Sequence, residues 1–142
     1  MNEITKLLMS ILFQTTLCYT LFSHHLKLGH YEKAYDAMVA NPDKTRRKDS
    51  LRQFVVTLFE RKQFKQLAYF PYIDMFEDLE QIIETRARSV DLSVNNYYDF
   101  LYSFHVSKEN YRKGMIIQRF IKIYYYQISF SLFYHFSCVC NV

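Results

Sequence analysis

Three histidines in the first quarter of the chain are the residues best suited to bind a metal ion. His24, His25 and His30 are separated by one, five and six positions. A zinc site on a helix needs two ligands at positions i and i+4, or a pair of cysteines, so that the side chains converge on one ion. This spacing does not meet that requirement, and we expect ordinary histidines at a helix end.

The cysteines do not form a framework. Cys138 and Cys140 make a C-x-C pair near the C-terminal end, and Cys18 is the third cysteine of the chain. No second pair is present to complete a metal or redox site. An odd number of cysteines without framework spacing indicates a reducing compartment, the cytosol or the nucleus.

A group of carboxylates is the next place where chemistry would be sought. Glu77, Asp78, Glu80 and Glu84 lie close together in the chain. An acid–base pair requires surroundings that shift two pKa values apart, and nothing nearby would do so. We therefore expect a solvated helix face.

No nucleophile elbow, phosphate-binding loop or dinucleotide fingerprint is present in the sequence. We therefore predict that the chain is not an enzyme and has no catalytic, cofactor-binding or metal-binding residues. The sequence leaves the partner-binding residues unknown, with Tyr19 and Tyr97 as candidates at solvent-facing positions.

A short basic run allows two interpretations. Lys44-Thr45-Arg46-Arg47-Lys48 has the composition of a nuclear address or of a phosphate contact. It also falls in the first turns of an amphipathic helix, where a solvated face is expected, and this second interpretation is favoured.

The distribution of charge argues against a dedicated nucleic-acid binder. All 14 acidic residues and 16 of the 18 basic residues precede Gly114, so the body carries +2 of the net +4. Arg119 and Lys122 supply the rest. A nucleic-acid binder usually has a strong basic excess on one face.

Low glycine and proline content predicts an all-α fold of short-turned helices. The chain has 2 glycines and 2 prolines, too few for many tight turns or flexible linkers. Gly29 should end the first helix, and Asn41 should cap a helix whose first residue is Pro42. The expected helices span 4–28, 30–40, 43–62, 63–69, 74–89 and 95–106, with another beginning near Lys108. They form stacked antiparallel pairs, as in an α-solenoid.

Apolar spacing predicts which side of each helix is buried. Ser93 or Asn95 is the expected cap of the helix over residues 95–106. The expected inward residues are Tyr31, Ala34, Tyr35 and Met38; Leu51, Phe54, Val55, Leu58 and Phe59; Phe76, Leu79, Ile82, Ile83 and Ala87; and Tyr98, Leu101, Tyr102 and His105.

Residues 115–142 differ in composition from residues 1–114, and we expect a helical repeat segment followed by an atypical apolar tail. The tail contains no Asp, Glu, Gly or Pro, and its aromatic and β-branched residues favour strands and aggregation. Its uncharged stretch allows a membrane segment as an alternative, although serines and tyrosines dilute its hydrophobicity. The N-terminal residues, which include Glu3 and Lys6, do not resemble a signal peptide.

Two stretches carry a family resemblance. Residues His24–Phe64 and Asn95–Gly114, the second reading NNYYDFLYSFHVSKENYRKG, are joined by FPYIDMFEDLEQIIETRARSVD. Together they resemble the C-terminal tetratricopeptide-like helical region of the one-hundred-and-sixty-kilodalton nucleoporin family of the Y-shaped nuclear pore scaffold. The resemblance covers about residues 20 to 114 and is a run of consecutive matches.

The resemblance implies a structural subunit at the nuclear envelope that supports messenger RNA export and protein transport. Other scaffold nucleoporins of the Y-shaped complex are the implied partners. No cofactor, small-molecule substrate or direct nucleic-acid contact is expected. The family is far longer, so a short or alternatively ended form is expected. A small tail-anchored membrane protein with a helical head is the alternative.

Removing the tail should improve solubility, because it would take away the uncharged aromatic segment. We expect a chain ending at Gly114 to leave more protein in the supernatant after centrifugation than the full chain does. A less soluble truncated chain would contradict this and would indicate that the tail packs as a cap.

Overall fold

The computed structural model describes residues 2–89, 97–109, 112–119 and 121–123, and every regular element among them is a helix. The predicted all-α class is confirmed. The chain divides into two compact units, Met1–Ile82 and Ile83–Val142. The expected boundary after Gly114, between a repeat segment and a tail, stays a prediction.

The first unit begins with the long helix α1, Glu3–Leu28. As predicted, Gly29 ends it in the left-handed conformation, with φ at 77°. The N–H groups of Gly29 and His30 then bond to the carbonyls of Leu26 and His25, which closes the last turn. The chain reverses there, and α2, Tyr31–Val39, packs on α1.

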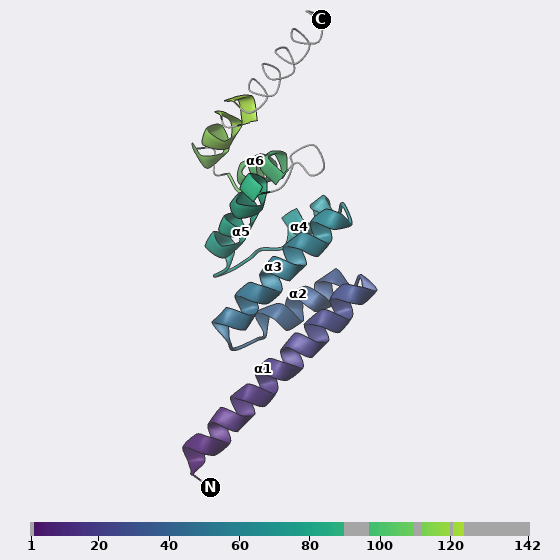
Figure 1. Ribbon diagram of the computed structural model, residues 1–142, viewed down its shortest axis with the longest axis vertical. Coiled ribbons are helices and arrows are strands. Elements are labelled where there is room, and N and C mark those ends of the chain that lie inside the picture. Colours follow the sequence, from purple (N-terminus) through teal and green to yellow (C-terminus); the bar gives the residue numbers. More distant parts are fainter. Residues whose placement is uncertain (1, 90–96, 110–111, 120, 124–142) are drawn as a thin grey trace, which may run out of the picture. The chain divides into compact units, whose positions relative to one another are not determined.

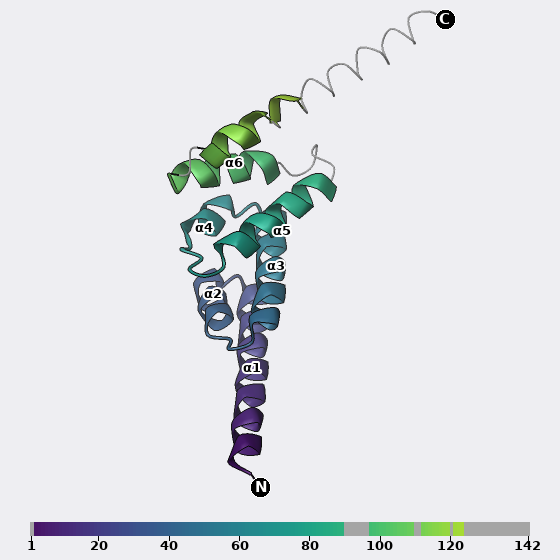
Figure 2. The same ribbon diagram turned by 90° about the vertical axis from the view of Figure 1, so that its left-hand side faces the viewer.

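A difference in length leaves half of α1 uncovered. At 1.5 Å per residue α1 is about 39 Å long, whereas the nine residues of α2 reach only about 14 Å. The buried residues of α1 are Thr15, Cys18, Phe22 and Leu26, one stripe in its C-terminal half. Figures 1 and 2 show the N-terminal half extending past α2 and α3.

The start of α3, Lys44–Glu60, differs from the prediction. Asp43, rather than Asn41, is the cap, and its carboxylate accepts from the N–H groups of Thr45 and Arg46. Pro42 precedes the cap instead of opening the helix. Asn41 is buried, where it accepts from the Asp43 N–H and donates to the Thr15 carbonyl. It therefore ties the turn to α1.

The apolar face of α3 lies where the spacing placed it. All five predicted residues of this face are fully buried. Helix α4, Phe64–Tyr69, follows after a short turn and packs against α3. It ends before Phe70 and Pro71, as expected from the restriction that proline places on the preceding residue.

Five aromatic rings hold α1, α2, α3 and the segment after α4 together. We call Phe22, Tyr35, Phe54, Phe70 and Tyr72 the aromatic cluster. Tyr35 stacks on Phe70 with ring centroids 4.5 Å apart, and the ring of Tyr72 meets Tyr35 edge-on at 5.7 Å. Phe54 lies 5.6 Å from Phe70 and 6.5 Å from Phe22. Such pairs contribute about 0.5 to 1.5 kcal/mol each beyond their buried area.

Two hydrogen bonds fix the cluster's geometry. The Tyr72 N–H donates to the Tyr35 hydroxyl oxygen at 3.1 Å, and the Tyr72 hydroxyl donates to the Leu67 carbonyl at 2.7 Å. Tyr72 is fully buried in a left-handed backbone conformation, with φ at 49°. Burial raises the pKa of both phenols, so these hydroxyls stay protonated at neutral pH.

Helix α5, Phe76–Ser89, carries acidic residues in its first turn and arginines in its last, which suits the helix dipole. Leu79, Ile82, Ile83 and Ala87 are buried as predicted, whereas Phe76 is only half-buried. Phe76 is the first residue of the helix.

The second unit includes α6, Tyr97–Ser107, whose buried face was predicted only in part. Leu101 and His105 are buried, but Tyr98 and Tyr102 are half-buried, and Tyr97, Phe100 and Phe104 take the inner positions. The buried face is rotated by about one residue from the prediction, because Phe100 and Phe104 have no hydroxyl that burial would strip of water, whereas Tyr98 and Tyr102 do. The expected caps Ser93 and Asn95 lie outside the described residues.

The helix expected near Lys108 begins later. Lys108 lies in a turn, and residues 112–119 and 121–123 are helical, whereas Tyr111 lies outside the described residues. The first residues of the apolar tail that the structure describes, 115–119 and 121–123, are thus helical despite their strand propensity. Local propensity is a weak determinant of structure.

Replacing Tyr35 by phenylalanine tests the aromatic cluster. Tyr35→Phe keeps the ring stack but leaves the buried Tyr72 N–H without its acceptor, so the free energy of unfolding should fall by about 1 to 3 kcal/mol. Urea denaturation followed by circular dichroism measures this change. The matched control Tyr69→Phe alters an exposed phenol, and its effect should stay within about 0.5 kcal/mol. Equal effects of the two variants would contradict the assigned bond.

Candidate interaction surfaces

The end of α1 is held by a side chain from the end of α3. The guanidinium of Arg61 donates to the carbonyls of Leu26 and Lys27 at 3.1 and 3.3 Å. It also donates to the Tyr31 hydroxyl at 3.3 Å and lies over that ring. A cation beside the last carbonyls of a helix adds hydrogen bonds to them and is favoured by the helix dipole. This contact sets the direction of α1 relative to α3.

The predicted histidine group gathers beside this helix end. The ring centroids of His24 and His25 are 5.8 Å apart, and those of His25 and His30 are also 5.8 Å apart. Among the described residues, no group of three or more His, Cys, Asp or Glu side chains is arranged to hold a metal ion. Cys138 and Cys140 lie outside the described residues, and Cys18 is a buried free thiol.

His25 has a perturbed titration. Its ring is half-buried, and its Nδ1 atom is buried without a hydrogen-bond partner. Burial lowers the pKa of His25 below its usual value, and the positive charges of Lys33, His24 and His30 lower it further. The neutral ring is therefore the form that the fold favours.

The four predicted carboxylates of α5 are not buried. Asp78 pairs with Lys48 at 2.7 Å, and Glu84 lies 3.8 Å from Arg88 one turn along. Of the two tyrosines considered for partner contact, Tyr19 is 39% exposed, but Tyr97 is buried at 3% exposure. The prediction for Tyr97 is wrong, because its ring enters the core of the second unit.

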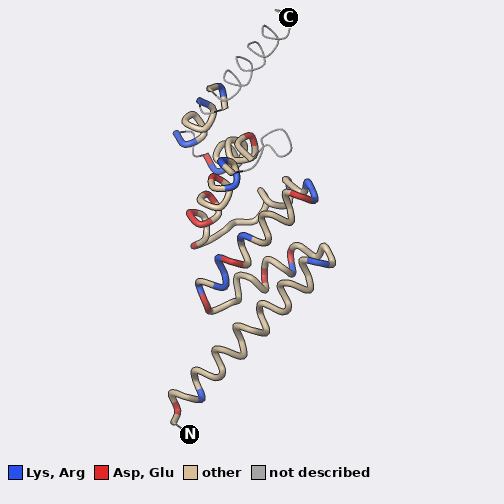
Figure 3. The backbone as a smooth tube through the Cα atoms, in the orientation of Figure 1, with Lys and Arg blue, Asp and Glu red and all other residues tan. Residues whose placement is uncertain are grey.

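The N-terminal half of α1 is an exposed apolar surface. Between Lys6 and Lys27 the sequence has no Asp, Glu, Lys or Arg, and the tube in Figure 3 is uncoloured over that length. Thr16 and Thr20 donate their hydroxyls to carbonyls four residues earlier, which hides their polarity. We call this surface the α1 apolar segment; it comprises Ile4, Leu7, Leu8, Met9, Ile11, Leu12, Phe13 and Leu17, each 42% to 71% exposed.

An exposed apolar surface of this kind marks an interaction site. Among the described residues, α1 is the one helix long and apolar enough to cross a membrane by length and composition. Its C-terminal half, however, packs in the protein core. The free part, residues 3–14, reaches only about 18 Å, short of the roughly 30 Å of a bilayer core. Packing against other helices fits this segment better.

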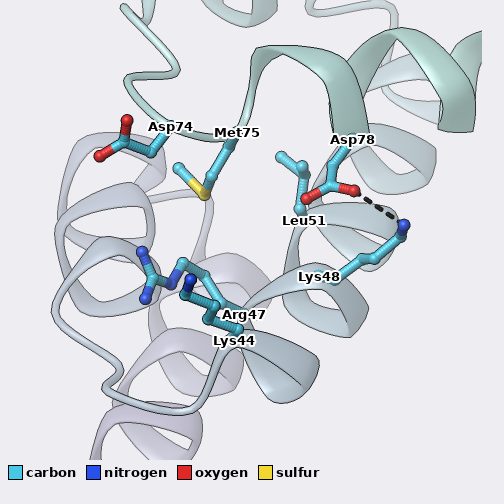
Figure 4. A pocket seen from close by; sticks show the side chains of 7 residues that line it. All are labelled: Lys44, Arg47, Lys48, Leu51, Asp74, Met75 and Asp78. Carbon is cyan, nitrogen blue, oxygen red and sulfur yellow. Dashed lines mark ion pairs between the residues drawn. The ribbon is translucent and has the colours of Figure 1, made fainter.

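A second surface lies at the start of α3, where a pocket of about 520 Å³ opens. Figure 4 shows Lys44, Arg47 and Lys48 on the α3 side and Asp74, Met75 and Asp78 on the other. Leu51 also lines it. At one edge of the pocket, Lys48 reaches from α3 to bond both Asp78 and Gln81, at 2.7 and 3.1 Å (Figure 4).

The basic run was expected to be a solvated helix face, and this holds only in part. Lys44 and Arg46 are exposed, whereas Arg47 and Lys48 are half-buried. The prediction missed a contact between distant parts of the chain. Asp74 and Asp78 come more than 25 residues after Lys48, and the aromatic cluster brings the segment that contains them against α3. No local signal in the basic run indicates this.

Comparison with known proteins identifies relatives along most of the chain. A family model described as NUP160/120 middle TPR matches residues 8–118. The nuclear pore complex protein Nup160 of Homo sapiens is 50% identical over 101 residues, which cover 71% of this chain and 7% of that protein. The Nup160 homolog of Drosophila melanogaster is 49% identical over 96 residues, covering 68% of this chain and 7% of that protein.

A more distant relative extends the comparison. Nucleoporin NUP120 of Chaetomium thermophilum is 25% identical over 106 residues, covering 73% of this chain and 8% of that protein. The chain thus spans less than a tenth of the length of these relatives. The matched region includes most of the α1 apolar segment, from Leu8 onward.

Acidification should destabilise the fold through His25. Because its folded pKa is lowered, the unfolded chain binds a proton more tightly than the folded chain does. The stabilising contribution is therefore present above the ordinary value of 6.5 and is lost as the pH falls through the lowered folded pKa. Urea midpoints measured between pH 7.5 and 5.5 should decrease.

The variant His25→Gln should flatten this pH dependence, since its amide does not titrate. The control His24→Gln changes the exposed neighbour and should keep most of the slope. An unchanged slope in His25→Gln would show that other groups cause it.

Proposed function

The chain belongs to the NUP160/120 middle TPR family, and we propose that it is a structural segment of the nuclear pore scaffold. In this role it binds other scaffold nucleoporins of the Y-shaped complex at the nuclear envelope. It supports messenger RNA export and protein transport through the scaffold to which it contributes. Its role is mechanical rather than catalytic, in keeping with its helical repeats.

The observation that carries this proposal is the α1 apolar segment. In its C-terminal half, α1 buries one face against α2 and α3, as a helix of a helical repeat does. The same helix continues for three more turns with large apolar side chains exposed. A helix that is apolar on all sides is stable when other helices surround it.

Neighbouring scaffold helices are the occupant that we propose for this surface. Helical repeats bury their apolar faces only by stacking on adjacent repeats. The relatives are more than ten times as long as the matched region, which supports a stack that continues beyond the helices described here. The uncharged surface favours close packing of aliphatic side chains over a polar, reversible contact.

The position of this segment within the longer family protein is a finer proposal. The resemblance suggested the C-terminal helical region, whereas the matching family model is described as middle TPR. We infer a place within the tetratricopeptide-like helices, and the C-terminal assignment stays a prediction.

The tail-anchored alternative receives less support. It rests on residues 120–140, nearly all of which lie outside the described part of the chain. Relatives that are nuclear pore proteins do not favour it.

Charge introduced into the α1 apolar segment should abolish scaffold binding. We expect the tagged full chain to co-precipitate scaffold nucleoporins of the Y-shaped complex from nuclear extract. The double variant Leu8→Glu with Leu12→Glu should recover at least about tenfold less, since burying an unpaired carboxylate opposes apolar packing. Quantitative mass spectrometry of the precipitate measures the recovery.

The matched control Tyr69→Glu with Ile73→Glu adds the same charge at residues that are 76% and 72% exposed elsewhere in the first unit. Its recovery should equal that of the unmodified chain. If the folded, unmodified chain recovers no scaffold nucleoporin, or if both variants lose recovery equally, the proposal is wrong. Retention of the chain in carbonate-washed membranes would instead favour the tail-anchored alternative.

A further inference from the structure

The first turns of α3 carry positive charge at the end of the helix where the helix dipole disfavours it. Four of its first five residues are cations, Lys44, Arg46, Arg47 and Lys48, and its first turn has no acidic residue. The N-terminus of a helix is already electropositive, so cations there are locally unfavourable. Asp43 offsets part of this charge as the cap. Departures from local rules of this kind concentrate at functional sites.

Only one of these cations has a counter-charge. Lys48 is paired with Asp78. Across the part of the chain that the structure describes, the side chains of Lys44 and Arg47 form neither ion pairs nor hydrogen bonds. The Nε atom of Arg47 is buried without a hydrogen-bond partner. A buried guanidinium N–H group without an acceptor is rare in folded proteins and requires a reason.

The end of the same guanidinium group lies at the pocket (Figure 4). Figure 4 shows the ends of the Lys44 and Arg47 side chains close together on one side of the pocket and the Asp74 carboxylate on the opposite side. Leu51 and Met75 form the floor of the pocket and are themselves almost fully buried, at 0% and 4% exposure. The pocket therefore offers two cations for an anion and an acceptor across from them.

We propose that this pocket binds an acidic peptide segment of a partner protein. A glutamate or aspartate side chain of the peptide accepts hydrogen bonds from Arg47 and Lys44. A peptide N–H donates to Asp74, and a neighbouring side chain of the peptide covers the floor of the pocket. Guanidinium groups bind carboxylates with matching planar geometry, which gives the contact its direction.

The rim of the pocket distinguishes a peptide from a nucleic acid. Asp74 and Asp78 place carboxylates beside the two free cations, and these would repel a polyphosphate chain. A peptide has N–H donors for the same carboxylates. This inference stands apart from the proposed scaffold role, because it concerns a site away from the α1 apolar segment and is measured on the chain alone.

Fluorescence anisotropy with a labelled peptide tests the proposal. The probe is a fluorescein-labelled peptide of alternating glutamate and leucine, titrated with the full chain at 50 and 150 mM salt. We expect saturable binding that Lys44→Gln with Arg47→Gln weakens by about tenfold. Arg47→Lys keeps the charge but loses the planar guanidinium, so it should weaken binding by a smaller factor.

Matched controls separate the pocket from general charge. Lys33→Gln with Lys65→Gln removes the same charge from exposed positions on α2 and α4 and should leave the affinity unchanged. A peptide of alternating lysine and leucine should not bind. Circular dichroism confirms that each variant is folded.

Three outcomes overturn the proposal. The first is the absence of binding by the folded, unmodified chain, and the second is an equal loss of affinity in the two double variants. The third is tighter binding of a thymidine oligonucleotide than of the acidic peptide, with the loss again at Lys44 and Arg47, which would make the pocket a nucleic-acid site.

Discussion

The contact between Tyr35 and the Phe70–Tyr72 segment is the constraint on which the first unit depends. Tyr35 stacks on one ring, meets a second edge-on, and accepts the N–H of Tyr72, so three interactions act at one residue. They fix the segment after α4 against α2 and α3. Because Asp74 and Met75 follow within three residues of Tyr72, the same contact sets where the pocket wall lies. Core packing thus determines the geometry of a surface site.

The α1 helix is anchored in its C-terminal half and uncovered in its N-terminal half. Arg61 and Asn41 fix the C-terminal half of α1 from two sides, at its last carbonyls and at the Thr15 carbonyl. This anchoring sets the direction in which the uncovered N-terminal half of α1 extends past α2 and α3 (Figures 1 and 2). Rigidity matters for a scaffold, since a preorganised surface loses less entropy on association.

The charged groups around α3 contribute position more than stability. The Lys48 and Asp78 side chains are 38% and 39% exposed, and such pairs contribute at most about 1 kcal/mol because water and salt screen them. This pair holds the Lys48 ammonium group at the edge of the pocket (Figure 4). Lys44 and Arg47, which also line the pocket, are not part of the pair.

Apolar spacing determined most of the helices, the buried face of α3, and the buried face of α2 except for Tyr31, which is half-buried. Period 3.6 and the scarcity of glycine and proline leave few alternatives. The sequence also determined where α1 ends, because Gly29 adopts the positive φ of this position more easily than other residues do. The cap of α3, the inner face of α6, the burial of Tyr97 and the pocket were decided by tertiary structure. These features depend on which residues fill the core or on contacts with segments distant in the chain. The local spacing of apolar residues specifies neither of these. Sequence and tertiary structure both determine the exposed half of α1. Its residues are apolar in the sequence, but they are uncovered only because α2 is too short to reach them.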